Sequence, residues 1–117
     1  MRKIAMTAAG LSLAAGVLGA GLAVAPSADA ATACPSGAFC IRETNGTILS
    51  KNIFYSYGNH NLSNVTGKRV LINNQTGGAG FKLCFGYSGT RCSAVDRAKG
   101  TFSPYDMTPI NSVVLVK

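Results

Sequence analysis

Short apolar runs, broken every few residues by Gly, Asn, Ser or Thr, fill the chain from residue 31 onward. No apolar run there repeats with the 3.6-residue period of a helix, and frequent turn residues between short runs are typical of all-β domains. Thr44-Asn45-Gly46-Thr47 predicts a tight turn, because Asn-Gly adopts positive φ readily. The pattern predicts strands at residues 38–42, 53–57, 69–73, 81–85 and 113–116, an Asn-rich loop at 58–64 and a turn at 74–78.

The β-rich pattern occurs twice, with an offset of 43 or 44 residues. The matched segments are 39–41 with 81–85, 45–47 with 88–90, 59–62 with 103–106, and 70–73 with 113–116. A repeat with four short strands in each half is what two Greek-key motifs would produce. We therefore expect an all-β fold, a small β-sandwich of two Greek-key motifs, with repeats at about 34–76 and 79–117.

The first 30 residues have the pattern of a secretory signal peptide. A basic start at residues 1–3 precedes an uncharged apolar stretch at 4–24 and the small-residue site Ala28-Asp29-Ala30. A membrane anchor is the alternative, since about 20 apolar residues can span a bilayer. A second candidate cleavage site ends at Ala33. We expect cleavage after Ala30 or Ala33, secretion into the extracellular space, and no membrane attachment after cleavage.

The remaining part, residues 31–117, is the length of one small domain and contains all four cysteines. A chain this short often needs covalent bridges, and export would place the cysteines where disulfides persist. Proximity favours the pairs Cys34–Cys40 and Cys84–Cys92, although a long-range pair such as Cys40–Cys84 stays open. A zinc site is disfavoured because there is no Cys-x-x-Cys spacing.

Net charge suggests the kind of partner. Without residues 1–30, the chain's 11 basic and four acidic side chains become nine and three, a net charge of +6. A basic secreted protein can be attracted to acidic proteins, to acidic cell-wall or surface polymers, or to membranes. The positive charges are spread along the chain, and charge distributed in this way more often serves solubility than nucleic-acid binding. No nucleic-acid-binding motif is present. We expect a monomer.

Few side chains are available for catalysis. His60 is the single histidine, and Glu43, Asp96 and Asp106 are the carboxylates after residue 30. These residues form no recognisable nucleophile–base set or carboxylate pair, so we expect neither an enzyme nor a cofactor or metal site. The segment 106–112 faintly resembles a calcium loop, but one carboxylate predicts weak binding at most.

The segment Cys34-Pro35-Ser36-Gly37-Ala38-Phe39-Cys40 resembles the opening of peptidase inhibitor family I36, whose members are secreted proteins of actinobacteria. Residues 69–77 also resemble the strand and Asn-rich turn in the middle of that family's domain. The resemblance implies a βγ-crystallin-like fold and inhibition of thermolysin-type metalloproteinases through the second disulfide loop. Carried over by position, that loop is Cys84–Cys92 and the reactive bond follows Cys84.

The candidate binding residues therefore lie in the segment Cys84–Cys92. Phe85 and Tyr87 would be aromatic anchors, Arg91 a polar contact, and a disulfide would hold the loop extended before binding. The competing interpretation places Phe85 and Tyr87 in the core of an ordinary strand, because Leu83, Phe85 and Tyr87 alternate. The alternative function is a noncatalytic crystallin-like extracellular binding or antimicrobial module.

Overall fold

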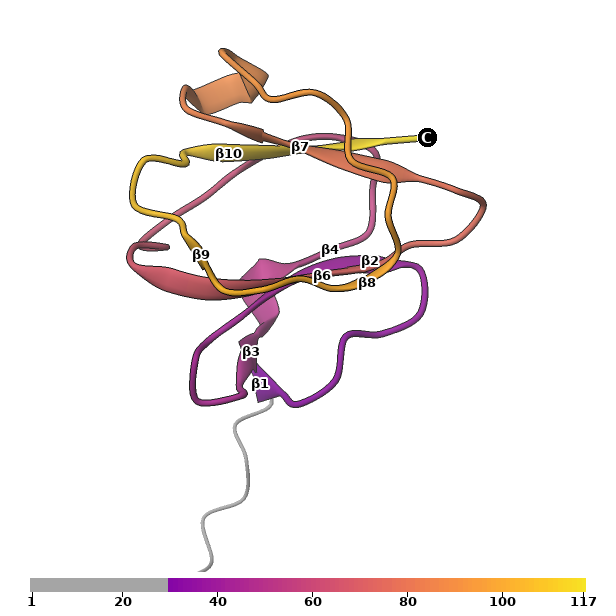
Figure 1. Cartoon of the computed structure of the whole chain (residues 1–117), viewed down its shortest axis with the longest axis vertical. Coiled ribbons are helices and arrows are strands. Elements are labelled where there is room, and N and C mark those ends of the chain that lie inside the picture. The colour runs from indigo at the N-terminus through magenta and orange to yellow at the C-terminus, as the bar shows by residue number, and fades with distance from the viewer. Residues whose placement is uncertain (1–29) are drawn as a thin grey trace, which may run out of the picture.

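The computed structural model describes residues 30–117, and in this part the chain forms ten strands and two short 3₁₀ helices. The predicted export segment lies outside the described residues, except for Ala30 at its end. Two sheets lie one above the other (Figure 1). The first sheet contains β2 (Ala38–Arg42), β4 (Ile53–Phe54), β6 (Lys68–Asn74), β8 (Gly100–Thr101) and β9 (Tyr105–Asp106). The second sheet contains β5 (Gly58–Asn61), β7 (Gly80–Cys84) and β10 (Ser112–Val116), and β1 (Ala30–Ala31) pairs with β3 (Ile48–Leu49).

The core lies between the two sheets. The rings of Phe39 in β2 and Phe81 in β7 have centroids 4.5 Å apart, so the inner faces of the two sheets are in direct contact. Leu71, Val113 and Leu115 complete the centre of this cluster. In β2, β7 and β10, alternate residues point into this core. The expected all-β sandwich is confirmed.

The two sheets have the same pairing pattern after a shift of 42 residues. Phe39 pairs with Asn73 in the first sheet, and Phe81 pairs with Leu115 in the second. Phe39 and Phe81 are 42 positions apart, as are Asn73 and Leu115. The neighbouring contact follows the same rule, because Phe39 also pairs with Phe54 and Phe81 with Asp96.

Each half of the chain contributes one strand to the sheet of the other half. Gly58 in β5 pairs with Leu115 of the second sheet, and Gly100 in β8 pairs with Asn73 of the first. These two pairs are again related by 42 positions. Two interlocked Greek-key motifs result, and the hydrogen-bonded exchange of strands joins both halves into one unit.

The offset of 43 or 44 residues expected from the sequence differs from this register. Side chains alternate between the two faces of a strand, so an offset that is wrong by one residue matches residues on opposite faces. Val113, which the sequence matched with Val70, lies in the main core, whereas Val70 lies in a second cluster on the outer side of the first sheet. At the observed offset, Cys40 corresponds to Lys82 and not to Cys84.

One strand and one loop were placed wrongly from the sequence. The strand expected at 53–57 ends at Phe54, and the loop expected at 58–64 contains the strand β5. Gly58-Asn59-His60-Asn61 has no apolar alternation, so propensity gives no strand signal. The segment is a strand because its backbone pairs with β10, where His60 lies opposite Val113.

Both locally paired disulfides are present, Cys34–Cys40 and Cys84–Cys92, and no cysteine in residues 30–117 is free. Paired cysteines indicate an oxidising environment such as the extracellular space. Within the same residues, no helix is both long enough and apolar enough to cross a membrane.

Candidate functional site

The predicted binding loop is a hairpin that leaves the end of β7, and we call residues 84–92 the second hairpin. Cys84 is the last residue of β7 and lies directly opposite Cys92. The Phe85 N–H donates to the Arg91 carbonyl at 3.0 Å, and the Gly86 N–H donates to the Thr90 carbonyl at 3.0 Å. The disulfide and these two hydrogen bonds fix the base of the hairpin.

The tip of this hairpin has an unusual backbone. Ser88 and Arg91 have φ values of 59° and 54°, in the left-handed region that non-glycine residues adopt at a cost of about 1 kcal/mol each. The 3₁₀ turn η2 (Tyr87–Gly89) contains Ser88 and reverses the chain. Surrounding contacts must hold such a conformation.

Those contacts come from the second sheet, because the hairpin folds back over its outer face. The Ser88 N–H donates to Asn61 Oδ1 at 2.7 Å, and the Gly89 N–H donates to Ser112 Oγ at 3.1 Å. Ser112 Oγ in turn donates to the Gly86 carbonyl at 2.7 Å. Figure 1 shows the turn lying over β10 and β7, on the side of the molecule opposite β1 and β3. The hairpin is therefore tied to the sheet by its backbone, which leaves its side chains free.

The candidate aromatic residues are exposed in this arrangement. Phe85 is 48% exposed and Tyr87 is 57% exposed, so neither ring is buried in the core. Cys84, in contrast, is fully buried. Alternation continues only as far as Leu83, which packs against the core, because β7 ends one residue later.

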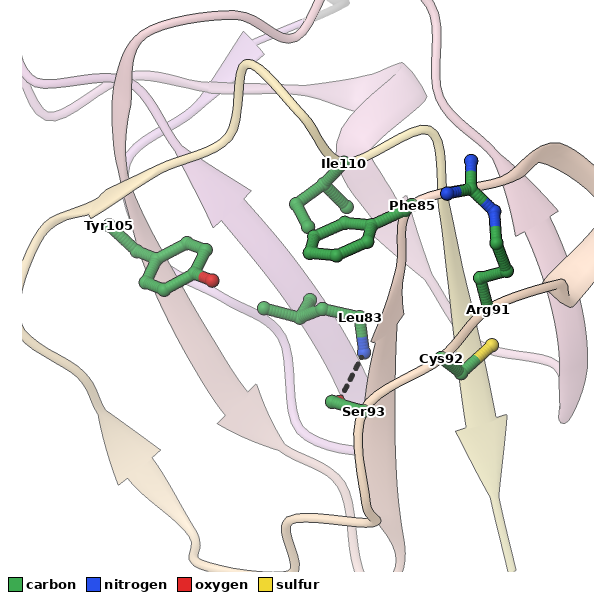
Figure 2. A pocket seen from close by; sticks show the side chains of 7 residues that line it. All are labelled: Leu83, Phe85, Arg91, Cys92, Ser93, Tyr105 and Ile110. Carbon is green, nitrogen blue, oxygen red and sulfur yellow. Dashed lines mark hydrogen bonds between the residues drawn. The ribbon is translucent and has the colours of Figure 1, made fainter.

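Phe85 and Arg91 lie beside each other. The Arg91 guanidinium carbon is 5.9 Å from the centroid of the Phe85 ring, within the range of a cation–π contact. On its other side the Phe85 ring lies next to Ile110 and faces Tyr105 (Figure 2). Phe85 is thus one wall of a hollow, whereas Tyr87 does not line it.

The hollow itself was not anticipated from the sequence. It measures about 200 Å³ and is lined by Leu83, Phe85, Arg91, Cys92, Ser93, Tyr105 and Ile110 (Figure 2). A neighbouring hollow of about 380 Å³ shares Leu83 and Tyr105 with it. Tyr105 is 44% exposed at the start of β9, and no local pattern indicates that it would face Phe85. Tyr105 is placed there by the pairing of β9 with β6 of the first sheet, whereas Phe85 directly follows β7 of the second sheet.

The peptide group that the family resemblance marks as reactive is not free. The Cys84 carbonyl accepts a hydrogen bond from the Asn111 N–H at 2.9 Å, and the Phe85 N–H donates to Arg91. Asn111 Nδ2 also donates to the Phe85 carbonyl at 2.7 Å. Both polar groups of the Cys84–Phe85 bond are paired, so a protease could reach this bond only after local opening of the hairpin.

Within residues 30–117, no group of three or more His, Cys, Asp or Glu side chains could hold a metal ion. Glu43 forms an ion pair with Arg69 at 3.1 Å, and both residues are far in sequence from the second hairpin. Asp106 accepts hydrogen bonds from the Thr108 hydroxyl at 2.7 Å and from the Thr108 N–H at 3.0 Å. These bonds, with Lys68 nearby, lower the pKa of Asp106 from its ordinary value of 3.8.

The chain matches no protein-family model, no curated protein and no solved structure at a significant level. The resemblance of residues 34–40 to the inhibitor family therefore stays an expectation from the sequence, and function is inferred from the site itself.

Proposed function

We propose that the protein is a secreted inhibitor of extracellular proteases that blocks the active site of its target with the second hairpin. The observation that supports this most is a covalently closed hairpin with two exposed aromatic side chains, Phe85 and Tyr87. Exposed aromatic anchors often contribute 2 kcal/mol or more to an interface. Thermolysin-type metalloproteinases are the first target class to test, because the sequence resemblance points to them.

Rigidity of the hairpin favours this function. Backbone hydrogen bonds to Asn61 and Ser112, together with the Cys84–Cys92 bridge, hold the loop in one conformation before binding. Less conformational entropy is then lost on association. The mature net charge of +6 would also speed encounter with an acidic enzyme.

Blockade by an intact hairpin fits the geometry better than cleavage and religation. The Cys84–Phe85 bond is paired on both sides and Cys84 is buried, so the side chains of Phe85, Tyr87 and Arg91 would make the contacts. An inhibitor of this kind would remain uncut in the complex.

Inhibition assays with the exported, oxidised protein test the proposal. Thermolysin, subtilisin and trypsin are titrated with the unaltered protein and with Tyr87→Ala and Phe85→Ala. Tyr55→Ala is the matched control, because Tyr55 is also an exposed tyrosine, with 60% of its surface accessible. It lies before the Gly58 end of β5, which is the end of that strand away from the second hairpin. We expect the unaltered protein to inhibit thermolysin. Tyr87→Ala or Phe85→Ala should weaken this inhibition at least tenfold, and Tyr55→Ala should leave it unchanged.

Circular dichroism and thermal unfolding show whether each variant is folded, and mass spectrometry shows whether the hairpin has been cut. Absence of inhibition of all three enzymes by folded, oxidised protein would contradict the proposal. The noncatalytic extracellular binding module would then be the better interpretation.

A further inference from the structure

The hollow beside the second hairpin is shaped to receive a group. Phe85 and Ile110 lie on one side of it and Tyr105 on the other, and the Leu83 side chain extends between them (Figure 2). Its volume of about 200 Å³ is large enough for a phenyl ring, since a cavity of about 150 Å³ lined by similar side chains holds benzene. Four apolar or aromatic walls make a large side chain the natural occupant.

One of the two hydroxyls in this hollow, that of Ser93, is already used. Ser93 Oγ accepts the Leu83 N–H at 3.1 Å and donates to the Ala94 carbonyl at 3.1 Å. The polar groups left to recognise a ligand are the Tyr105 hydroxyl and Arg91, which is the one charged residue of the lining. The Arg91 guanidinium lies on the side of Phe85 away from Tyr105 (Figure 2).

Arg91 has no anionic partner within residues 30–117. The three carboxylates there are engaged elsewhere: Glu43 with Arg69, Asp106 with Thr108, and Asp96 with the N–H of Ala98. Arg91 also has a left-handed backbone, with φ of 54°, and its guanidinium lies near the Phe85 ring. An arginine held beside an apolar hollow, with its donors free, is suited to bind a carboxylate.

We propose that this hollow binds the C-terminal residue of a peptide or protein whose last side chain is bulky and apolar. The side chain would fill the space between Phe85 and Tyr105, and the terminal carboxylate would pair with Arg91. A carboxylate and an apolar side chain on one residue match best, because Arg91 lines the same small hollow as the two rings. The positive net charge of the domain favours an anionic ligand.

This site goes beyond the proposed inhibition and does not depend on it. It shares Phe85 and Arg91 with the second hairpin, but Tyr105 and Ile110 come from the segment that follows β8. Peptide binding is measured without any protease, so failure of one proposal leaves the other standing.

Titration of the ¹⁵N-labelled, oxidised protein with short peptides, followed by NMR, tests the inference. The probes are acetyl-Gly-Gly-Phe, the same peptide with a C-terminal amide, acetyl-Gly-Gly-Ala, and acetyl-Glu-Phe-amide. We expect the free acid ending in Phe to shift the amide signals of Phe85, Arg91 and Tyr105. Its affinity should be at least fivefold higher than that of each other probe.

Variants assign the two contacts separately. Arg91→Gln should bring the affinities for the Phe acid and the Phe amide to within twofold of each other. Tyr105→Ala should weaken both peptides at least fivefold, and Tyr55→Ala should change neither.

Equal affinity of the unaltered protein for acid and amide would overturn the inference, and this comparison needs no variant that could misfold. Equal affinity for acetyl-Glu-Phe-amide would also overturn it, because an internal acidic residue would then suffice.

Discussion

The two halves of the molecule carry equivalent hairpins that have become chemically different. In the first half, the Glu43 N–H donates to the Thr47 carbonyl at 2.8 Å after β2 ends. In the second half, the Phe85 N–H donates to Arg91 after β7 ends, at the position 42 residues later. The second hairpin encloses two more residues than the first and is closed by a disulfide. One backbone plan therefore supports a plain turn in one half and a candidate binding loop in the other.

The outer faces of the two sheets explain the difference. The first sheet has a small apolar cluster on its outer side that buries Ile48 completely, directly after the first hairpin. At the corresponding place in the second sheet, Ser112 takes the position of Val70, and its hydroxyl bonds to the hairpin backbone. Hydrogen bonds to the backbone hold a loop without burying its side chains, whereas an apolar cluster holds a loop by burying them. This difference leaves Phe85 and Tyr87 available to a partner.

The largest expected effect comes from making the second hairpin as open as the first. Cys84→Ser combined with Cys92→Ser removes the bridge and should lower the free energy of unfolding by about 2–3 kcal/mol, because the loop gains entropy mainly in the unfolded state. Inhibition of the target protease should fall with it. Urea unfolding and the inhibition assay are the measurements.

Cys34→Ser combined with Cys40→Ser is the matched control for this change. It should lower stability by a similar amount while the folded fraction keeps its inhibition. Equal loss of inhibition in both pairs of variants would show that the two bridges do not differ in function.

A smaller effect is expected at Gly86, where the first hairpin has a residue with a side chain, Thr44. A Cβ at Gly86 would clash with Thr90 Oγ1, although the backbone there is extended and open to any residue. Gly86→Ala should cost about 1–3 kcal/mol through this clash, and it should displace the hydrogen bond from the Thr90 hydroxyl to the Tyr87 carbonyl. Thermal or urea unfolding measures the loss.

Thr44 is the equivalent residue of the first hairpin and is exposed. Thr44→Ala should change the stability by less than about 0.5 kcal/mol. A similar loss at both positions would argue against the tight packing of the second hairpin.

The smallest expected effect is a pH dependence that comes from Asp106 in the second half. Asp106 corresponds to Asn64 at the observed offset, and its pKa is lowered by the bonds from Thr108 and by Lys68. A folded-state pKa below the unfolded one stabilises the protein above the ordinary value of 3.8, and this contribution disappears as the pH falls through the folded-state pKa. Between about pH 5 and about pH 2, the unaltered protein should therefore lose slightly more stability than Asp106→Asn. Parallel acid curves for the two proteins would contradict this assignment.

Local chemistry was enough to predict much of the fold. Short apolar runs gave β2, β6, β7 and β10, since these strands bury alternate side chains. The spacing of the cysteines favoured the two bridges that the structure contains. The repeat was also visible in the sequence, but the expected offset was one or two residues larger than the observed one. Similarity between two segments does not show which residues lie on the same face of a strand.

The sequence by itself determined a disulfide-bridged all-β domain with an aromatic loop between Cys84 and Cys92, because strand alternation, turn residues and short cysteine spacing are local properties. Tertiary structure alone decided that Gly58–Asn61 is a strand, since its only reason to be extended is pairing with β10. It also decided that Phe85 is a wall of a hollow with Tyr105 and Ile110. That hollow exists because β9, which pairs with β6 of the first sheet, brings Tyr105 to the second hairpin that follows β7 of the second sheet, and contacts between such distant segments are not encoded in any single one of them.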